Sequence, residues 1–309
     1  MPRLARLRGF GRRHRRLIAV TGSLAAAGVL AVVIAGHRHE FSRAISSASA
    51  GALLLATALQ IVALLARTEA WHVCIEAAGG TLARRVLFRA SSLGYVGSLL
   101  NAQLGAAARI TALRRSAPAN SPPVSTLVAA ELPIMAVEAA FGALTSFTLI
   151  GPLGLPWWAP LVFLGAIAAA SSGLRHLARR ERELWHGLLV LRSLRGGRRL
   201  VAFVMVAVTA QVLRNWALLH AVGVHASFFD AIAVLIAMST LAQLPVGPSV
   251  GAAAAVLILG RQGVAAVAAA GILSTATGIA GGLTFAAWAG ADRLWSGRTA
   301  RKHLTRDLH

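Results

Sequence analysis

The stretch that decides the fold class reads VAAVAAAGILSTATGIAGGLTFAAWAG, from Val264 to Gly290, and contains no charged residue. A helix needs about 20 mostly apolar residues to cross a bilayer, so this stretch is long enough to span one. The whole chain has the same character, with 57% hydrophobic and 13% charged residues among its 309. Soluble proteins carry about 25% charged residues. The composition therefore argues against a soluble enzyme and predicts a multi-pass membrane protein.

Further hydrophobic segments precede this one along the chain. They are residues 17–36, 44–66, 90–108, 124–150, 157–173, 200–222 and 228–259. The first has the basic flank of a signal peptide, but its apolar core is longer than the roughly 7–15 residues of such a peptide, so we interpret it as a retained anchor. The last is interrupted by Pro245-Val-Gly-Pro248.

The distribution of arginine predicts the topology. Seven arginines precede Leu17, which places the N-terminus in the cytoplasm. Complete crossing by every segment would place the eight arginines of residues 174–199 outside. If 90–108 and 228–259 instead enter the membrane and return, on opposite sides, then 27 of the 31 basic residues are cytoplasmic.

This arrangement predicts an all-α, polytopic helix bundle with about six full spans and two oppositely directed re-entrant elements, in the plasma membrane. A single transmembrane domain, 17–291, lies between basic cytoplasmic tails at 1–16 and 292–309. Within it, 174–199 alternates arginine with leucine and tryptophan, which predicts an amphipathic helix on the cytoplasmic face.

A short internal echo supports two related halves. Ala102-Gln-Leu104 is followed directly by Gly105-Ala-Ala-Ala108, and Ala242-Gln-Leu244 is followed, after an insertion, by Gly251-Ala-Ala-Ala254. Paired broken helices in the two halves of a transporter mark its binding site. The echo therefore favours an inverted repeat with a site at its broken helices.

Ionisable residues inside the spans are candidates for function. Glu131 and Glu138 are seven residues apart, so they project about 20° apart on one helix face. A charge in the bilayer costs at least ~2.5–3.5 kcal/mol, so these carboxyls must face the interior, be protonated or pair with a cation, and Arg214 is the expected partner. Gln211, Arg214 and Asn215 form one polar stripe, in which arginine suits a lipid phosphate; the alternative is that Arg214 snorkels to the surface.

The stretch from Pro245 to Gly251 opens an alanine-rich half-helix, whose N-terminus favours an anion such as phosphate. For this stretch, a tight turn between two hydrophobic helices is the alternative. Residues 105–109 would form the matching site from the other side. Gly278 and Gly282 have the GxxxG spacing of close helix packing, either internal or between two copies.

Four short motifs belong together: Arg67-Thr-Glu-Ala-Trp71, the Asn101…Gly105…Arg109 set, Glu131, and the Pro/Gly-rich stretch 244–251. They resemble the membrane region of lysylphosphatidylglycerol synthases, a family of flippase-like integral membrane proteins that also occur as stand-alone chains. The resemblance covers roughly residues 17–290. It departs at Ala106, where the family has an acidic residue, and at Leu132, where the family has arginine. No hydrophilic stretch matches the aminoacyl-transferase domain, so the resemblance implies a lipid-handling module without lysyl transfer.

We therefore expect a membrane protein that binds and translocates a lipid, either an anionic phospholipid or a polyprenyl-phosphate-linked one. The alternative is a non-transporting scaffold or accessory subunit for a lipid-modifying or cell-envelope enzyme. The expected headgroup-binding residues are Asn101, Gly105, Arg109, Glu131, Glu138, Gln211, Arg214, Asn215, Pro245, Gly247 and Gly251.

We expect no enzymatic activity, cofactor, metal or nucleic-acid partner. Ser249 with His220 and His225 lacks the third group of a catalytic triad, and the pair His37 and His39 lacks further ligands. The expected partners are membrane lipids, and a homodimer or an envelope-enzyme partner stays open.

Overall fold

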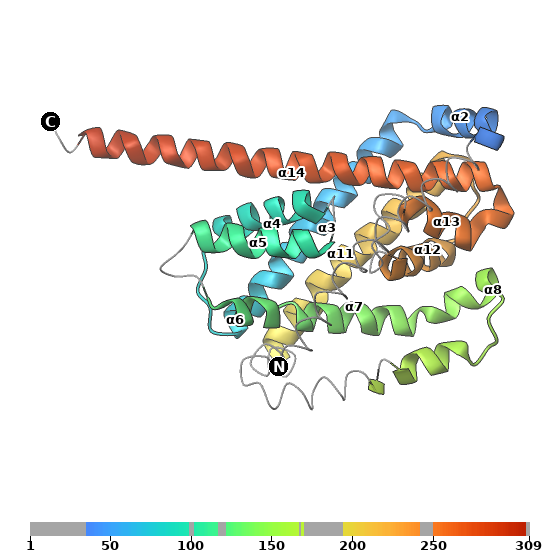
Figure 1. The fold of residues 1–309 in the computed structure, drawn as a ribbon, viewed down its shortest axis with the longest axis horizontal. Coiled ribbons are helices and arrows are strands. Elements are labelled where there is room, and N and C mark those ends of the chain that lie inside the picture. Colours follow the sequence, from blue (N-terminus) through green and yellow to red (C-terminus); the bar gives the residue numbers. More distant parts are fainter. Residues whose placement is uncertain are drawn as a thin grey trace, which may run out of the picture. The chain divides into compact units, whose positions relative to one another are not determined.

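The computed structural model describes residues 35–98, 102–116, 122–166, 168–169, 194–241 and 250–306. These residues form eleven α-helices and two short 3₁₀ helices, which confirms the all-α prediction (Figure 1). Most of the expected first span, 17–36, and most of the loop 174–199 lie outside the described residues.

Four helical segments are long and apolar enough to cross a membrane. They are α3 (Ala50–Ala77), α6–α7 (Val124–Leu144), α11 (Leu194–Ala221) and α14 (Val264–Arg306). They account for four of the six full spans expected from the sequence. Of the expected span 157–173, residues 159–166 are helical.

The boundaries of α3 differ from the expected span 44–66. Residues Arg38–Ser47 form a separate helix, α2, which ends where Ala48 takes an extended backbone with ψ of 113°. Helix α3 then continues past 66 to Ala77, so Arg67 lies inside a long apolar helix. The charges after residue 66 lower the local hydropathy, but they do not break a helix. The predicted span therefore ended too early, at residue 66 instead of Ala77.

The expected span 124–150 is bent. Helix α6 (Val124–Ala129) and helix α7 (Leu132–Leu144) meet at Ala130 and Glu131. Pro133 has no backbone N–H, so the carbonyl of Ala129 lacks its usual helical donor and the chain bends there. The 3₁₀ helix η1 (Ser146–Leu149) and the short α8 (Ile150–Leu153) follow. The bend presents Glu131 at an irregular point of the helix.

The expected re-entrant segment 90–108 is the inner part of a helical hairpin. Its arms, α4 (Arg84–Ser98) and α5 (Ala102–Ser116), lie side by side (Figure 1). Two glycines bring the backbones together: a Cβ at Gly94 would lie 2.7 Å from Cβ of Arg109, and one at Gly105 would lie 2.6 Å from Cβ of Ser98. Each 15-residue arm is about 22 Å long, shorter than the ~30 Å hydrocarbon core.

The second broken segment, 228–259, forms α12 (Phe228–Leu241) and α13 (Val250–Leu259), which pack against each other. A capping interaction fixes the start of α12, because the Ser227 amide donates to Asp230 Oδ2 at 2.8 Å and the Asp230 amide donates to Ser227 Oγ at 3.1 Å. The two echoed Gly-Ala-Ala-Ala sequences, 105–108 and 251–254, both lie near the start of the second helix of their pair.

The chain divides into two compact units. One combines α2, α8, α12 and α13, and its core includes Leu218, Val234 and Val267. The other contains α4–α7, and its core includes Trp71 and Ile134. Residues of α3, α11 and α14 contribute to both units, so each unit holds one broken helix pair and parts of the same three long helices.

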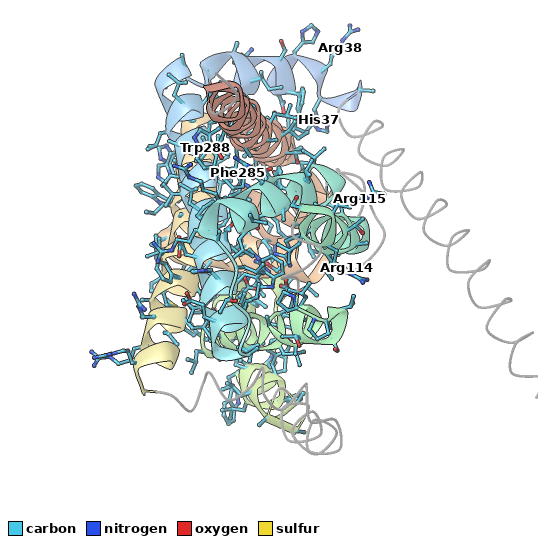
Figure 2. The ribbon with its side chains drawn as sticks, turned by 90° about the vertical axis from the view of Figure 1, so that its left-hand side faces the viewer. His37, Arg38, Arg114, Arg115, Phe285 and Trp288 are labelled. Atoms are coloured by element: carbon cyan, nitrogen blue, oxygen red, sulfur yellow. The ribbon has the colours of Figure 1, made fainter. Side chains whose placement is uncertain are left out.

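Within the second unit, α4 is fastened to the later part of α14. Arg89 Nη2 bonds to Asp292 Oδ2 at 2.6 Å, and Phe88 makes edge contacts with Phe285 and Trp288. Phe285 and Trp288 stack on each other along α14 (Figure 2). Helix α14 continues as a helix through the first part of the expected C-terminal tail.

The Gly278 and Gly282 spacing is used inside the chain. Tyr95 Oη of α4 donates to the Gly278 carbonyl at 2.8 Å, and the Tyr95 ring occupies the space that a Cβ at Gly282 would need. The neighbouring Gly281 faces α3, where a Cβ would lie 2.9 Å from Cγ of Gln60. This confirms the expected close packing and assigns it to α3, α4 and α14.

We predict that Gly282→Val lowers the apparent melting temperature of the detergent-purified protein by at least about 4 °C, because the added side chain displaces the Tyr95 ring. Gly290→Val is the matched control on the same helix, since no atom lies within 4 Å of its Cβ position. Equal melting temperatures for the two variants would contradict the packing described here.

Candidate functional site

Arg109 and Trp71 form the centre of the candidate site. Arg109 comes from α5 and Trp71 from α3, and the guanidinium carbon lies 4.1 Å from the centre of the Trp71 ring. This is a cation–π contact, which is strongest when both groups are removed from water. Trp71 is fully buried, and the Arg109 side chain is 15% exposed.

Glu131 neutralises Arg109. The bend at Pro133 presents Glu131 to α5, and its carboxylate forms an ion pair with Nη2 of Arg109. The Glu131 side chain is 22% exposed. The α4–α5 hairpin, α3 and the α6–α7 bend therefore meet at one charged contact.

A second ion pair joins Arg67 of α3 to Glu138 of α7. Arg67 precedes Trp71 by four residues, so the two side chains share a face of the helix. Arg67 Nη1 donates to Glu138 Oε1 at 2.5 Å, and Nη2 donates to Oε2 at 3.3 Å. The Arg67 and Glu138 side chains are 46% and 30% exposed. We call Arg67, Trp71, Arg109, Glu131 and Glu138 the charge cluster.

Two buried N–H donors of the charge cluster lack an acceptor within the described part of the chain. They are Trp71 Nε1 and Arg109 Nε. A buried donor without a partner costs about 1–3 kcal/mol, so each would gain from an acceptor oxygen. Both belong to the stacked pair of Arg109 and Trp71. A phosphate oxygen is an acceptor that this geometry suits, because guanidinium groups bind phosphate in charge-assisted hydrogen bonds.

Arg214 has a different environment from the one predicted. It is 5% exposed, and its Nη2 donates to the carbonyl and hydroxyl of Ser274 on α14, while Nε donates to Thr277 Oγ1 at 3.4 Å. The prediction that Arg214 pairs with the two glutamates is therefore wrong, since Arg67 and Arg109 take those roles. The snorkelling alternative is also wrong, because the side chain is buried.

The other two residues of the polar stripe on α11, Asn215 and Gln211, both form side-chain hydrogen bonds. Asn215 is 4% exposed and accepts a hydrogen bond from Ser274 Oγ at 3.1 Å. Gln211 lies in the other unit, where its Nε2 donates to Gln60 Oε1 at 3.0 Å. Gln60 was not among the site residues predicted from the sequence. A polar amide inside an apolar span could have indicated it, as it did for Gln211.

The remaining predicted residues divide into two groups. Gly105 packs against Ser98 and the Gly94 backbone, and Gly251 lies in the first turn of α13. Asn101, Pro245 and Gly247 lie outside the described residues. The predicted list included neither Arg67 nor Trp71, although their four-residue spacing was a visible signal.

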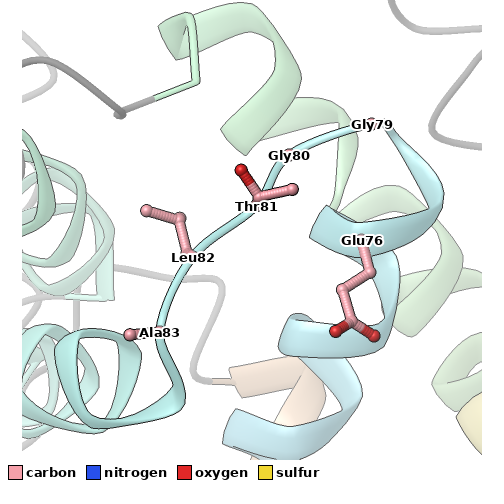
Figure 3. A pocket seen from close by; sticks show the side chains of 6 residues that line it. All are labelled: Glu76, Gly79, Gly80, Thr81, Leu82 and Ala83. Carbon is pink, nitrogen blue, oxygen red and sulfur yellow. The ribbon is translucent and has the colours of Figure 1, made fainter.

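A separate hollow of about 520 Å³ lies at the end of α3 (Figure 3). The turn 79–83 and the Glu76 carboxylate line it. Its lining is mostly main chain with one exposed acidic group, and none of the five residues of the charge cluster contributes to it.

Four long apolar helical segments among the described residues define this protein as a multi-pass membrane protein. The family model described as the lysylphosphatidylglycerol synthase TM region matches residues 17–287, and the chain belongs to this family. The match confirms the resemblance carried by the sequence motifs. Searches of curated proteins and of solved structures gave no match.

We predict that Arg109→Met destabilises the protein by about 2–3 kcal/mol, because it leaves Glu131 partly buried without a counter-charge. The double variant Arg109→Met/Glu131→Leu should recover most of that loss. Thermal unfolding in detergent measures both effects, with the exposed Arg114→Met on the same helix as control. Additive losses in the double variant would show that the two side chains do not interact.

Proposed function

We propose that this protein binds a lipid with a phosphate headgroup and translocates it across the plasma membrane. The lipid is an anionic phospholipid or a polyprenyl-phosphate-linked one. The observation that carries the proposal is a pair of buried donors, Trp71 Nε1 and Arg109 Nε, that lack an acceptor among the described residues and lie beside two ion pairs. Family membership supports a role in lipid handling.

The place of the charge cluster favours a lipid as its ligand. Arg67 lies 17 residues after the start of α3 and 10 before its end, so it is near the middle of a candidate span. A phosphate beside Arg67 would meet N–H donors held in place by the helices that carry them. Arginine supplies several N–H groups in one plane, which suits phosphate better than a single ammonium. Among common bilayer components, a phospholipid or polyprenyl phosphate brings such a group with its own apolar chain.

The α4–α5 hairpin supports the re-entrant part of the proposal. Its open end carries Arg84 and Arg85 at the start of α4, both exposed. It also carries Arg114 and Arg115 at the end of α5, which are exposed too (Figure 2). Four arginines at one end favour the cytoplasmic side, and short arms favour entry and return on that side. We propose that α12 and α13 form the opposite re-entrant element, with both termini cytoplasmic.

In this proposal, Arg214 and Asn215 of α11 are further candidate headgroup contacts, and their hydrogen bonds with Ser274 of α14 hold them in place. A non-transporting scaffold for an envelope enzyme is the competing function, and it requires neither unfilled donors nor buried arginines.

The test is movement of headgroup-labelled lipid in proteoliposomes, with labelled phosphatidylglycerol and a labelled polyprenyl phosphate as separate substrates. Trp71→Phe keeps the aromatic face and removes one donor. Arg109→Gln/Glu131→Gln removes the pair without leaving a lone charge. We expect both variants, and Arg214→Gln, to lower the rate at least about tenfold, while Arg114→Gln at the exposed hairpin end leaves it unchanged.

Movement of neither lipid by the folded wild-type protein would reject translocation and favour the scaffold. Movement that all the variants retain would show that lipid takes a route away from the charge cluster. Circular dichroism and gel filtration of each variant separate a loss of function from a loss of folding.

A further inference from the structure

The charge cluster is electrically balanced when empty. Arg67 and Arg109 carry two positive charges, and their partners Glu138 and Glu131 carry two negative charges. A phosphodiester brings one further negative charge into surroundings where an unbalanced charge is expensive. Something must therefore restore neutrality as the headgroup binds. A proton taken up by one of the two carboxylates restores it with no other ion.

Glu138 is the carboxylate placed to take this proton. Its side chain is 30% exposed and its partner Arg67 is 46% exposed, so this pair is the less enclosed of the two. Oε1 of Glu131 is fully buried, and its partner Arg109 is 15% exposed. Protonation of Glu138 also weakens its hold on Arg67. Arg67 lies one helical turn from Trp71, so its freed guanidinium is close to the two unfilled donors.

The other charged groups around Glu138 are consistent with Glu138 as the residue that takes the proton. Arg67 faces it from α3, and Arg109 with Glu131 forms the second pair from α5 and the α6–α7 bend. Helix α11 joins the same hydrophobic core through Leu200 and Val204. Its nearest charges in the sequence are exposed at its start: Arg195, Arg198 and Arg199.

We propose that the lipid phosphate and a proton bind together. The proton comes from water and bonds to a carboxylate oxygen of Glu138, Arg67 leaves that carboxylate, and the phosphate accepts hydrogen bonds from Arg67, Arg109 and Trp71. Release of the lipid returns the proton to water and re-forms the Arg67–Glu138 pair. This inference rests on the proposed function, because it describes how the same site holds its lipid.

The experiment is calorimetric titration of the detergent-purified, full-length protein with dihexanoylphosphatidylglycerol. The titration is run at one neutral pH in two buffers of different ionisation enthalpy, and the difference in binding heat gives the number of protons taken up. We expect about one proton per lipid for the wild type. Glu138→Gln should still bind, up to about tenfold more tightly because the cluster gains net positive charge, and should take up no proton.

Glu76→Gln is the matched control, since it changes an exposed carboxyl of α3 outside the charge cluster. It should keep the wild-type proton uptake. Wild-type binding without proton uptake would overturn the coupling and leave the proposed function intact. Undiminished uptake in Glu138→Gln would overturn the assignment to this residue. Absence of binding by the folded wild type would reject the proposed function together with this inference.

Discussion

The pairing of charges inside apolar helices is the constraint on which the rest of this structure depends. An unpaired arginine or glutamate at membrane depth costs several kcal/mol, so each must meet its partner when the helices assemble. Arg109 with Glu131 joins the α4–α5 hairpin to the α6–α7 bend, and Arg67 with Glu138 joins α3 to α7. These two contacts determine which helices are neighbours in the second unit. Glu131 lies at the interruption between α6 and α7, next to Pro133.

Close backbone approach completes what the charges begin. The hydrophobic effect does not drive helices together in lipid, so association depends on packing and hydrogen bonds. Gly94 and Gly105 bring the hairpin arms into contact, which fixes where Arg109 stands. The Gly278 carbonyl accepts a hydrogen bond from Tyr95 of α4. Gly282 leaves room for the Tyr95 ring. Gly94, Gly105 and Gly282 are needed because they have no side chain, which leaves room for the neighbouring helix. Their backbone freedom is not required.

The sequence predicted the parts of the fold that hydrophobic length determines. It located α11 and α14, because their apolar length is visible in one dimension, whereas the re-entrant character of 90–108 and 228–259 was inferred from the arginine distribution and stays a prediction. It ended α3 at residue 66, because hydropathy falls where Arg67 and Glu69 begin, although their pairing keeps the helix intact. The seven-residue spacing of Glu131 and Glu138 predicted that they share a helix face, but it could not predict which helices carry their partners. Arg214 was chosen as their partner only because it stood alone in a span, and the unfilled donors of Trp71 and Arg109 exist only in three dimensions.

The balance of the charge cluster bears on what kind of site it is. A cluster with surplus positive charge would hold a phosphate tightly, and tight binding opposes release. Passage through a membrane needs binding favourable enough to admit the ligand and weak enough to release it. In the proposed function, two arginines already paired with two carboxylates would meet this condition, because each headgroup contact would compete with an internal one. The buried Trp71 and Arg109 donors that lack an acceptor among the described residues would supply the favourable part, and re-formation of the Arg67–Glu138 pair would let the lipid leave. The pairing of charges that the bilayer demands would therefore limit how firmly such a site holds a ligand.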